Sequence, residues 1–321
     1  MHWNRRLGIL WVGKGFERVN GSPTYETHKL APRTLQTGKS SARRKGATMG
    51  KRRAFTLIEL LVVIAIIALL MAMLMPALQR VKEQGKTVVC QARVKEWGLY
   101  FSMYTEDHNG YFHAGVGQGH THHWFNALRP YYHNDHNFCC CPTAMKPLFD
   151  ENGNASGSWN TFSAWGKFTL SRNGQGYAPE GDWGSYGING WVENPPPSYT
   201  TVYEDFETVN NWRTTNVKGA GYIPLFFDAL RFNVFPRHMD APPETEDLAW
   251  QSMQHMRRAC IDRHNGYING AFLDWSARKI GLKELWTLKW HKAYNTAGHW
   301  TKAGGVLSSD WPEWMRHFKD Y

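Results

Sequence analysis

One carboxylate stands inside the most apolar stretch of this sequence. Glu59 lies near the start of a run in which residues 60–75 carry no charge and no strong hydrogen-bonding side chain. A charge in such a segment costs about 2.5–3.5 kcal/mol on membrane-insertion scales, so a charge kept there indicates a functional partner. We therefore expect Glu59 to be paired. A position at the level of lipid headgroups, close to Arg53, stays open as the alternative.

The five cysteines could form disulfides or bind a metal ion. They are Cys90, Cys139, Cys140, Cys141 and Cys260. Consecutive cysteines do not easily bridge each other, and an odd number leaves at least one thiol over. We predict a disulfide from Cys90 to one of the triplet, which would close a loop of about 50 residues and contribute about 3–4 kcal/mol. A zinc site that joins the triplet to Cys260 or a histidine is an alternative, but its spacing matches no standard pattern.

Six histidines lie close together in the sequence after residue 112. They are His113, His120, His122, His123, His133 and His136. Neutral imidazole is a common ligand of zinc and copper, and His120, His122 and His133 are the candidates here. Because adjacent side chains cannot both point one way on a strand, we expect solvated loop histidines instead. The sequence has no nucleophile-elbow, P-loop, zinc-protease or EF-hand pattern, so we predict no enzymatic activity and no cofactor.

The segment that must position Glu59 is long enough to cross a membrane. Residues 57–75 give nineteen almost entirely apolar positions, and a span of a hydrocarbon core about 30 Å thick needs about 20. The basic Arg52 and Arg53 before it are expected to hold the N-terminal side in the cytoplasm, with the remainder across the membrane. A buried core helix fits this basic flank poorly. A cleaved secretory signal fits poorly as well, because the exit LMPALQR lacks a small-x-small site.

The positive charge of the chain is confined to its start. Residues 1–54 hold 13 Lys and Arg against 2 Asp and Glu, whereas residues 55–321 hold 24 against 25. The bulk of the chain is therefore close to neutral, which argues against nucleic-acid binding. Residues 1–48 have no hydrophobic period. They form either a long cytoplasmic leader or an over-extended gene start, and we favour Met49 as the true initiator.

The residues RRAFTLIELLVVIAIIALL resemble the N-terminus of type IV prepilins and type II secretion pseudopilins. The resemblance implies that a prepilin peptidase of the bacterial inner membrane cuts between Ala54 and Phe55 and N-methylates Phe55. The glycine usual before the cut is replaced here by Ala54. In that family, the carboxylate matching Glu59 meets the terminal amine of a neighbouring subunit in a filament. Glu59 lies one helical turn after Phe55, on the same face.

One helix is expected to continue well past the apolar run. Pro76 would kink it, as proline does inside helices, and the resemblance implies a helix that runs on. Apolar residues then recur at three-, four- and seven-residue steps; they are Leu78, Val81, Gly85, Val88, Ala92, Leu99 and Met103. We predict a membrane or filament-core helix over residues 55–76 and an amphipathic continuation over 77–108. The dipeptide Asn109-Gly110 would end it.

The remainder, residues 109–321, is predicted to be a globular head outside the cytoplasm. Short strands are expected at Tyr186–Val192, Tyr222–Phe227 and Gly266–Asp274, and a short helix at Leu282–His291. Loops are expected at the proline-rich residues 194–197 and 241–244. The expected fold class is therefore α+β: a long helix packed on a small antiparallel sheet with long loops. The many tryptophans would build the core, although sugar stacking stays an alternative.

Parts of the head are also similar to many bacterial pseudopilin-like proteins. The similar segments are CQARVKEWGLYFSMY, CPTA and SYGING. Residues 263–291 resemble the H-x9-D-G processing-associated domain of such proteins, in which His264 and Asp274 supply the His and the Asp and Trp275 replaces the Gly. If this segment is a hairpin, Asp274 could orient His264 across it. We expect a structural hydrogen bond there, with metal ligation, partner binding and catalysis left as alternatives.

Two readings of the function follow. The first is a pilin-like or pseudopilin-like structural subunit whose partners are the prepilin peptidase, the inner membrane and other subunits of a type IV pilus or type II secretion pseudopilus. The second is a membrane-anchored module that binds secreted cargo or a glycan and does not polymerise. A third, an anchored metal-dependent enzyme that uses the clustered histidines, is less favoured.

Overall fold

The structure is a computed structural model of the 321-residue chain. It describes residues 55–115, 123–132, 138–147, 160–166, 183–202, 205–246 and 254–321. The chain divides into two compact units, Met1–Leu57 and Ile58–Tyr321. Of the first unit, only residues 55–57 are described. Ala54, His120, His122, His133 and His136 lie outside the described residues.

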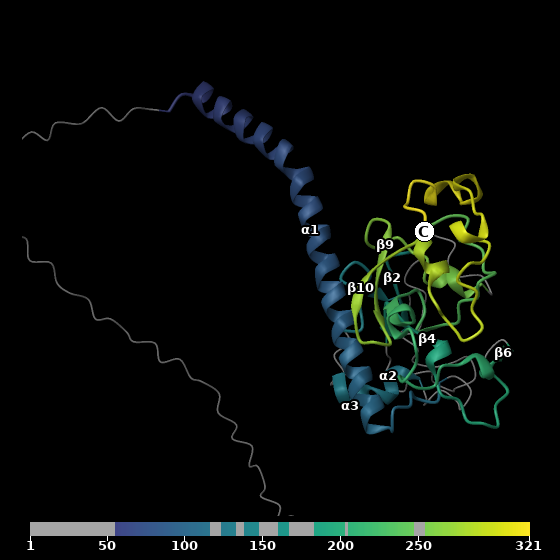
Figure 1. Cartoon of the computed structure of the whole chain (residues 1–321). Coiled ribbons are helices and arrows are strands. Elements are labelled where there is room, and N and C mark those ends of the chain that lie inside the picture. Colours follow the sequence, from purple (N-terminus) through teal and green to yellow (C-terminus); the bar gives the residue numbers. More distant parts are fainter. Residues whose placement is uncertain are drawn as a thin grey trace, which may run out of the picture. The chain divides into compact units, whose positions relative to one another are not determined.

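A single long helix, α1 (Leu57–Asp107), runs without interruption through Pro76 (Figure 1). It contains a segment long and apolar enough to cross a membrane, judged by length and composition. The helix ends where the sequence predicts. Asn109 and Gly110 both have left-handed backbone angles, with φ of 56° and 82°, and the Gly110 N–H donates to the Thr105 carbonyl over 2.7 Å. A glycine in this conformation is a common helix stop.

The principal sheet of the head has five strands in the order β10-β9-β7-β4-β8. Neighbouring strands are antiparallel except β4 and β8, which are parallel. Their bounds are β4 (Tyr186–Asn189), β7 (Pro224–Asp228), β8 (Asn233–Val234), β9 (Tyr267–Phe272) and β10 (Ala277–Gly281). The predicted α+β class is confirmed, with an edge pair that makes the sheet mixed rather than purely antiparallel.

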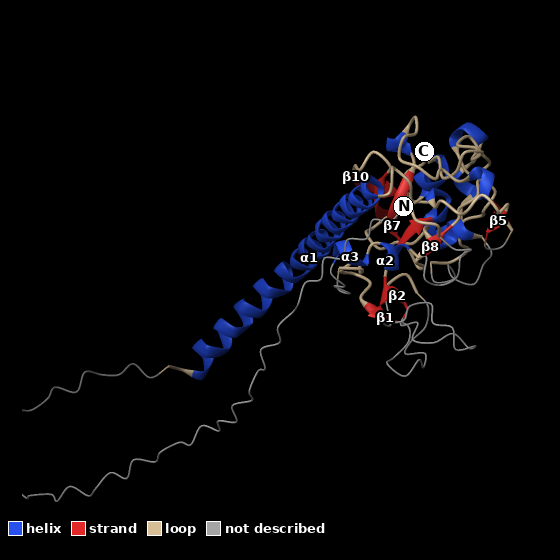
Figure 2. Cartoon of the chain, turned by 90° about the horizontal axis from the view of Figure 1, so that it is seen from below, coloured by secondary structure: helices blue, strands red, loops and turns tan. Residues whose placement is uncertain are grey.

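Shorter elements surround this sheet (Figure 2). They are α2 (Trp124–Ala127), α3 (Arg129–Tyr132), β1 (Lys146–Pro147), β2 (Ser163–Gly166), β3 (Trp183–Gly184), β5 (Thr201–Val202) and β6 (Phe206–Glu207). The 3-10 helices are η2 (Gly190–Val192), η3 (Thr208–Asn210), η4 (Ala220–Tyr222), η5 (His255–Arg258), η6 (Lys283–Thr287), η7 (Lys302–Gly304), η8 (Ser308–Asp310) and η9 (Glu313–Met315). Strands β1, β2 and β3 form one small sheet, and β5 pairs with β6.

Two local expectations need correction. The first predicted strand stops at Asn189, because the Asn189 side chain accepts a hydrogen bond from the Trp191 N–H and starts the 3-10 turn η2. The helix expected over residues 282–291 is shortened to η6, since the backbone becomes extended at Leu288, with ψ of 151°.

The packed face of α1 is the opposite of the predicted stripe. The helix buries Thr87, Cys90, Val94, Trp97, Gly98, Phe101, Tyr104 and Thr105. Leu78, Val81, Val88, Leu99 and Met103, which form the regular apolar stripe, are all at least half exposed. Apolar periodicity marks a face that can be buried but not the partner that covers it. In this helix the head covers the face that carries the aromatic side chains.

Tryptophan builds much of the core, as expected. Trp97, on the buried face of α1, has its ring centroid 5.0 Å from that of Trp124 and 5.1 Å from that of Phe226 on β7. A second apolar cluster is organised around Trp286 and Trp290. Among the described residues, seven tryptophans are buried: Trp97, Trp124, Trp165, Trp191, Trp286, Trp290 and Trp311. These rings are packed against other side chains and do not face a surface where a sugar could stack.

Candidate functional sites: the N-terminal motif and a buried cluster

The residues around the predicted cleavage point stand at the beginning of α1. Phe55 and Thr56 precede the first helical residue, and Glu59 lies in the first turn. A carboxylate in this position is favoured by the partial positive charge of the helix N-terminus. Every residue from 55 to 85 is exposed in this structure. Residues 55–75 therefore present a continuous apolar surface with one acidic side chain, Glu59, near the N-terminal end of α1.

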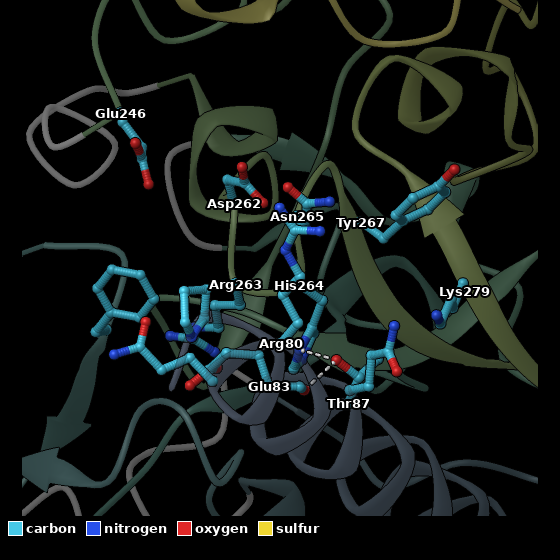
Figure 3. A pocket seen from close by; sticks show the side chains of 14 residues that line it. Arg80, Glu83, Thr87, Glu246, Asp262, Arg263, His264, Asn265, Tyr267 and Lys279 are labelled. Atoms are coloured by element: carbon cyan, nitrogen blue, oxygen red, sulfur yellow. Dashed lines mark hydrogen bonds between the residues drawn. The ribbon is translucent and has the colours of Figure 1, made fainter. Parts of the chain in front are cut away.

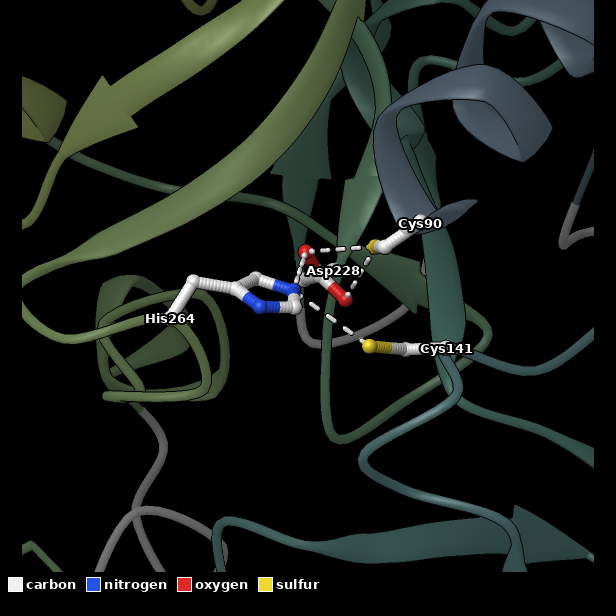
Figure 4. A group of neighbouring side chains, drawn as sticks. All are labelled: Cys90, Cys141, Asp228 and His264. Atoms are coloured by element: carbon white, nitrogen blue, oxygen red, sulfur yellow. Dashed lines mark hydrogen bonds and ion pairs between the residues drawn. The ribbon is translucent and has the colours of Figure 1, made fainter. Parts of the chain in front are cut away.

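A second group of reactive side chains meets inside the head. Cys90 comes from α1, Cys141 from the loop before β1, Asp228 from the end of β7 and His264 from the loop before β9. One sulfur, nitrogen or oxygen atom from each lies within 4.8 Å of the others. Figure 4 shows the imidazole of His264 directed toward the carboxylate and both sulfur atoms. All four residues are buried, so the group is enclosed by protein.

The contacts within this Cys–Cys–Asp–His cluster are short. His264 Nε2 lies 3.3 Å from Cys141 Sγ and 3.3 Å from Asp228 Oδ2. Cys90 Sγ lies 3.4 Å from Asp228 Oδ2 and 3.5 Å from its Oδ1. The carboxylate and one thiol thus approach the same ring nitrogen, while the other thiol approaches the carboxylate.

Each member of the cluster is held by a neighbouring group. Thr87 Oγ1 lies 3.1 Å from His264 Nδ1, which fixes the imidazole from its far side. The Tyr186 hydroxyl donates to Cys90 Sγ over 3.3 Å, and the backbone N–H of Asn269 donates to Asp228 Oδ2 over 2.8 Å. The buried guanidinium of Arg263 lies 3.5 Å from Asp228 Oδ1.

These contacts shift the protonation of the cluster. Burial lowers the pKa of His264, but the Asp228 carboxylate and Cys141 outweigh it and raise that pKa to about 10. Burial raises the pKa of Cys141, yet hydrogen bonds from Cys90 and His264 bring it down to about 6. Burial also acts to raise the pKa of Asp228, and His264, Arg263 and Asn269 together hold it below its ordinary value. Without a metal ion, these contacts favour the charged forms of His264, Cys141 and Asp228.

The geometry does not match a Cys–His–Asp catalytic relay. In such a relay the carboxylate binds one ring nitrogen and the nucleophile binds the other. Here Cys141 and Asp228 both approach Nε2, and Thr87 takes Nδ1. The cluster is better suited to holding something at its centre than to passing a proton along a line.

The sequence singled out three members of this cluster and missed the fourth. Cys90, Cys141 and His264 are candidate site residues in the sequence, but the carboxylate that orients His264 is Asp228 and not Asp274. Asp274 lies in the turn between β9 and β10, where its Oδ1 accepts hydrogen bonds from the Ser276 N–H and hydroxyl over 3.0 and 2.6 Å. Asp228 stands at no recognisable motif, and only the pairing of β7 with β9 brings it to His264.

The cysteines also differ from expectation. All five are thiols in this structure, so the predicted disulfide from Cys90 to the triplet is not formed, although Cys90 does lie close to Cys141. Cys260 lies elsewhere, with its sulfur 3.9 Å from Met315 Sδ. It is not a member of the group that Cys141 forms with Cys90, Asp228 and His264, so the zinc site that would join the triplet to Cys260 is not formed.

Two of the clustered histidines are not solvated. His113 and His123 are buried, each about 3% exposed. His113 Nε2 lies 3.8 Å from the buried carboxylate of Glu193, and the His123 ring packs 4.7 Å from the ring of Phe232. For these two positions the expectation of solvated loop histidines is wrong, because the segments that carry them fold onto the core.

A pocket of about 1120 Å³ lies beside the cluster. Figure 3 shows Arg80 and Glu83 of α1 on one side and Asp262, Asn265 and Tyr267 of the head around it. Thr87 and His264 contribute to its wall. The pocket therefore borders His264 and the Thr87 side chain that contacts its Nδ1, while the other three members of the cluster do not line it.

Trp275 occupies a backbone position that glycine adopts more easily. It has a φ of 65° in the turn between β9 and β10, where the resembling domain has Gly. Its carbonyl accepts a hydrogen bond from Lys95 Nζ of α1 over 2.6 Å, and its side chain packs on the first core cluster. These contacts hold a bulky residue in a conformation that it rarely adopts.

Comparison with known proteins identifies the start of the chain. Residues 49–75 match the prokaryotic N-terminal methylation motif. This segment is a prepilin-type methylation motif. The type IV wide pilus major component PilA4 of Thermus thermophilus is 41% identical over 63 residues, which cover 20% of this chain. The match spans 48% of that protein, about half its length. Among solved structures none matches this chain.

Proposed function

We propose that this chain is a pilin-like or pseudopilin-like structural subunit. A prepilin peptidase cuts it between Ala54 and Phe55 and methylates Phe55, and α1 anchors it in the bacterial inner membrane with the head outside the cytoplasm. It then joins a type IV pilus or a type II secretion pseudopilus. The observation that carries the proposal is the methylation motif at residues 49–75, followed directly by the apolar part of α1.

The surroundings of Glu59 support an assembly role. Cleavage before Phe55 would create a positively charged amine four residues upstream, at the end of an otherwise apolar helix. A buried charge is tolerated when an opposite charge meets it. In a stack of such helices, Glu59 of one copy would meet the new amine of its neighbour.

The exposed face of α1 supports packing between copies. Leu78, Val81, Val88, Leu99 and Met103 lie on the face opposite the head, and they extend the apolar surface of residues 55–75. Residues spaced by three, four, seven and eleven positions follow one side of a helix. We expect the α1 helix of a second copy to pack against this exposed apolar face, since it carries the same face with the same length and chemistry.

The first experiment determines the N-terminus of the protein isolated from cells. Terminal sequencing and intact mass should give a chain that begins with N-methylated Phe55. The same measurement on a strain without its prepilin peptidase serves as the control and should give the uncut chain. Native protein that begins at Met1 or Met49 without modification would end the proposal.

The second experiment separates processing from assembly. Glu59→Ala should leave the protein cut and inserted in the membrane but absent from sheared filaments. Glu83→Ala is the matched control, because Glu83 is an exposed acid of α1 beyond the apolar run, paired with Lys86 at 2.9 Å. Normal filament incorporation of the Glu59 variant would contradict the assembly role. Failure of the wild-type chain to enter any filament would favour an anchored module that binds cargo or a glycan.

A further inference from the structure

We propose that Cys90, Cys141, Asp228 and His264 bind one Zn²⁺ ion, which fastens the second half of α1 to the head. This site is independent of the N-terminal motif and of filament assembly. The four side chains come from four separate segments of the chain and bring two sulfur atoms, one nitrogen and one carboxylate together inside the protein. Thiolate and imidazole ligands in a closed set of four are typical of structural zinc.

The distances between ligand atoms fit a tetrahedral zinc centre. Bond lengths of about 2.3 Å to sulfur and about 2.0–2.2 Å to nitrogen and oxygen, at tetrahedral angles, place neighbouring ligand atoms roughly 3.3–3.8 Å apart. The shortest separations here are 3.3 Å from His264 Nε2 to both Cys141 Sγ and Asp228 Oδ2, and 3.4 Å from Cys90 Sγ to Asp228 Oδ2. The cluster is thus close to the size that an ion at its centre requires.

Hydrogen bonding alone satisfies this arrangement less well. Nε2 of His264 carries either one proton or one lone pair, so it cannot serve two partners fully at once. Cys141 and Asp228 nevertheless both approach it. A cation at the point where these atoms converge binds all four in the same geometry.

The neighbouring groups have the arrangement expected around a metal ion. A ligating histidine usually bonds through its other ring nitrogen to a nearby group, which fixes the ring. Thr87 makes this contact with Nδ1. Two thiolates and a carboxylate would leave the zinc site with one net negative charge, and the buried guanidinium of Arg263 lies next to Asp228 to balance it. Burial of an uncompensated charge would be costly.

The ion would link helix α1 to the head through ligands from both. Cys90 lies on α1, which also carries the membrane segment, and the other three ligands belong to the head. Because a metal site forms only in the folded chain, its binding free energy adds to folding stability. Zinc would therefore stabilise the packing of the head on the second half of α1.

The test uses the full chain, extracted in detergent and purified with a reductant. Elemental analysis should find about one equivalent of zinc per chain. After removal of zinc by a chelator, added Co²⁺ should produce the sulfur-to-cobalt charge-transfer absorption of a tetrahedral thiolate site. A chain that holds no zinc and binds neither Zn²⁺ nor Co²⁺ would refute the proposal, as would a Cys90–Cys141 disulfide found by mass spectrometry in the chain isolated from cells.

Matched variants locate the ion. Cys141→Ser should reduce bound zinc about tenfold or more, whereas Cys260→Ser, which changes a buried thiol outside the cluster, should leave it unchanged. Thr87→Ala changes no ligand and should weaken zinc binding while the charge-transfer bands persist. If Cys141→Ser does not fold, the cobalt spectrum of the wild-type chain still decides. Equal zinc loss in the Cys260 and Cys141 variants would contradict this site.

Discussion

From Leu57 to residue 85 the side chains of α1 are exposed, whereas from Thr87 to Thr105 one face of the same helix is buried against the head. Residues 57–75 of the first part are apolar on every side except for one acid, Glu59, and charged residues follow from Arg80 onward. The second part is mixed in polarity, yet it holds Trp97, which has no exposed surface. The contrast teaches that the total apolar surface of a helix segment does not predict which segment packs on the head. The packed face is the one that carries Trp97, Phe101 and Tyr104.

The largest effect is expected where this packed face is densest. Trp97→Ala removes a ring that contacts Trp124, Tyr132 and Phe226 and an indole N–H that donates to the Phe138 carbonyl. We expect the free energy of unfolding of the head to fall by about 3–5 kcal/mol. Denaturant titration of the detergent-solubilised chain, followed by tryptophan fluorescence and circular dichroism, measures it.

The control lies on the opposite face of the same helix. Leu99→Ala should change the stability of the head by no more than about 0.5 kcal/mol, because this side chain is half exposed. Its filament yield should fall instead if the exposed stripe packs against other copies. Equal losses of stability in Trp97→Ala and Leu99→Ala would contradict the conclusion that only the face with Trp97 packs on the head.

The next prediction concerns the carboxylate beneath the helix. Asp228→Asn removes the charge that meets both Arg263 and His264 in a fully buried position, so we expect a loss of about 3–5 kcal/mol. Asp274→Asn, in the exposed turn, should cost about 1 kcal/mol or less. Thermal unfolding of both variants, side by side, identifies which aspartate supports His264. A larger loss of stability in Asp274→Asn than in Asp228→Asn would instead support a pair of His264 with Asp274, as the H-x9-D spacing suggested.

The smallest effect is expected at the turn that contacts α1. Trp275→Gly relieves a left-handed conformation that costs a bulky residue about 1–2 kcal/mol, but it also removes a partly buried ring. The two effects oppose, so unfolding free energy should change by less than about 1 kcal/mol. Trp275→Val loses the ring and keeps the strain, and it should be less stable than the glycine variant. Equal stability of the two would mean that backbone strain is unimportant here.

The sequence predicted those features that depend on neighbours along the chain. Helix α1 ends at Asp107, because Asn109-Gly110 is a local stop. The strands β7 and β9 were found from short apolar runs bounded by turns. The sheet's parallel edge pair β4–β8 and the 3-10 turn at Gly190 were not found, since they depend on a contact with Phe232 and on a single side-chain hydrogen bond.

The candidate site was only partly visible for the same reason. Cys90, Cys141 and His264 lie in segments with recognisable patterns, but Asp228 does not. Sequence spacing suggested Asp274 because it is ten residues from His264 in a hairpin. In the folded head these two residues lie beyond opposite ends of β9, and the antiparallel pairing of β7 with β9 supplies Asp228 instead.

By itself, the sequence determined the start of this protein: an apolar helix, one acid within it and a methylation motif, all encoded within a few turns of one segment. Only the tertiary structure decided which face of α1 carries the head and which acid meets His264. Those choices depend on side chains 40 to 180 positions apart, such as Trp97 with Phe138 and Thr87 with His264. Local periodicity holds no information about partners at that distance, because only chain folding brings them together.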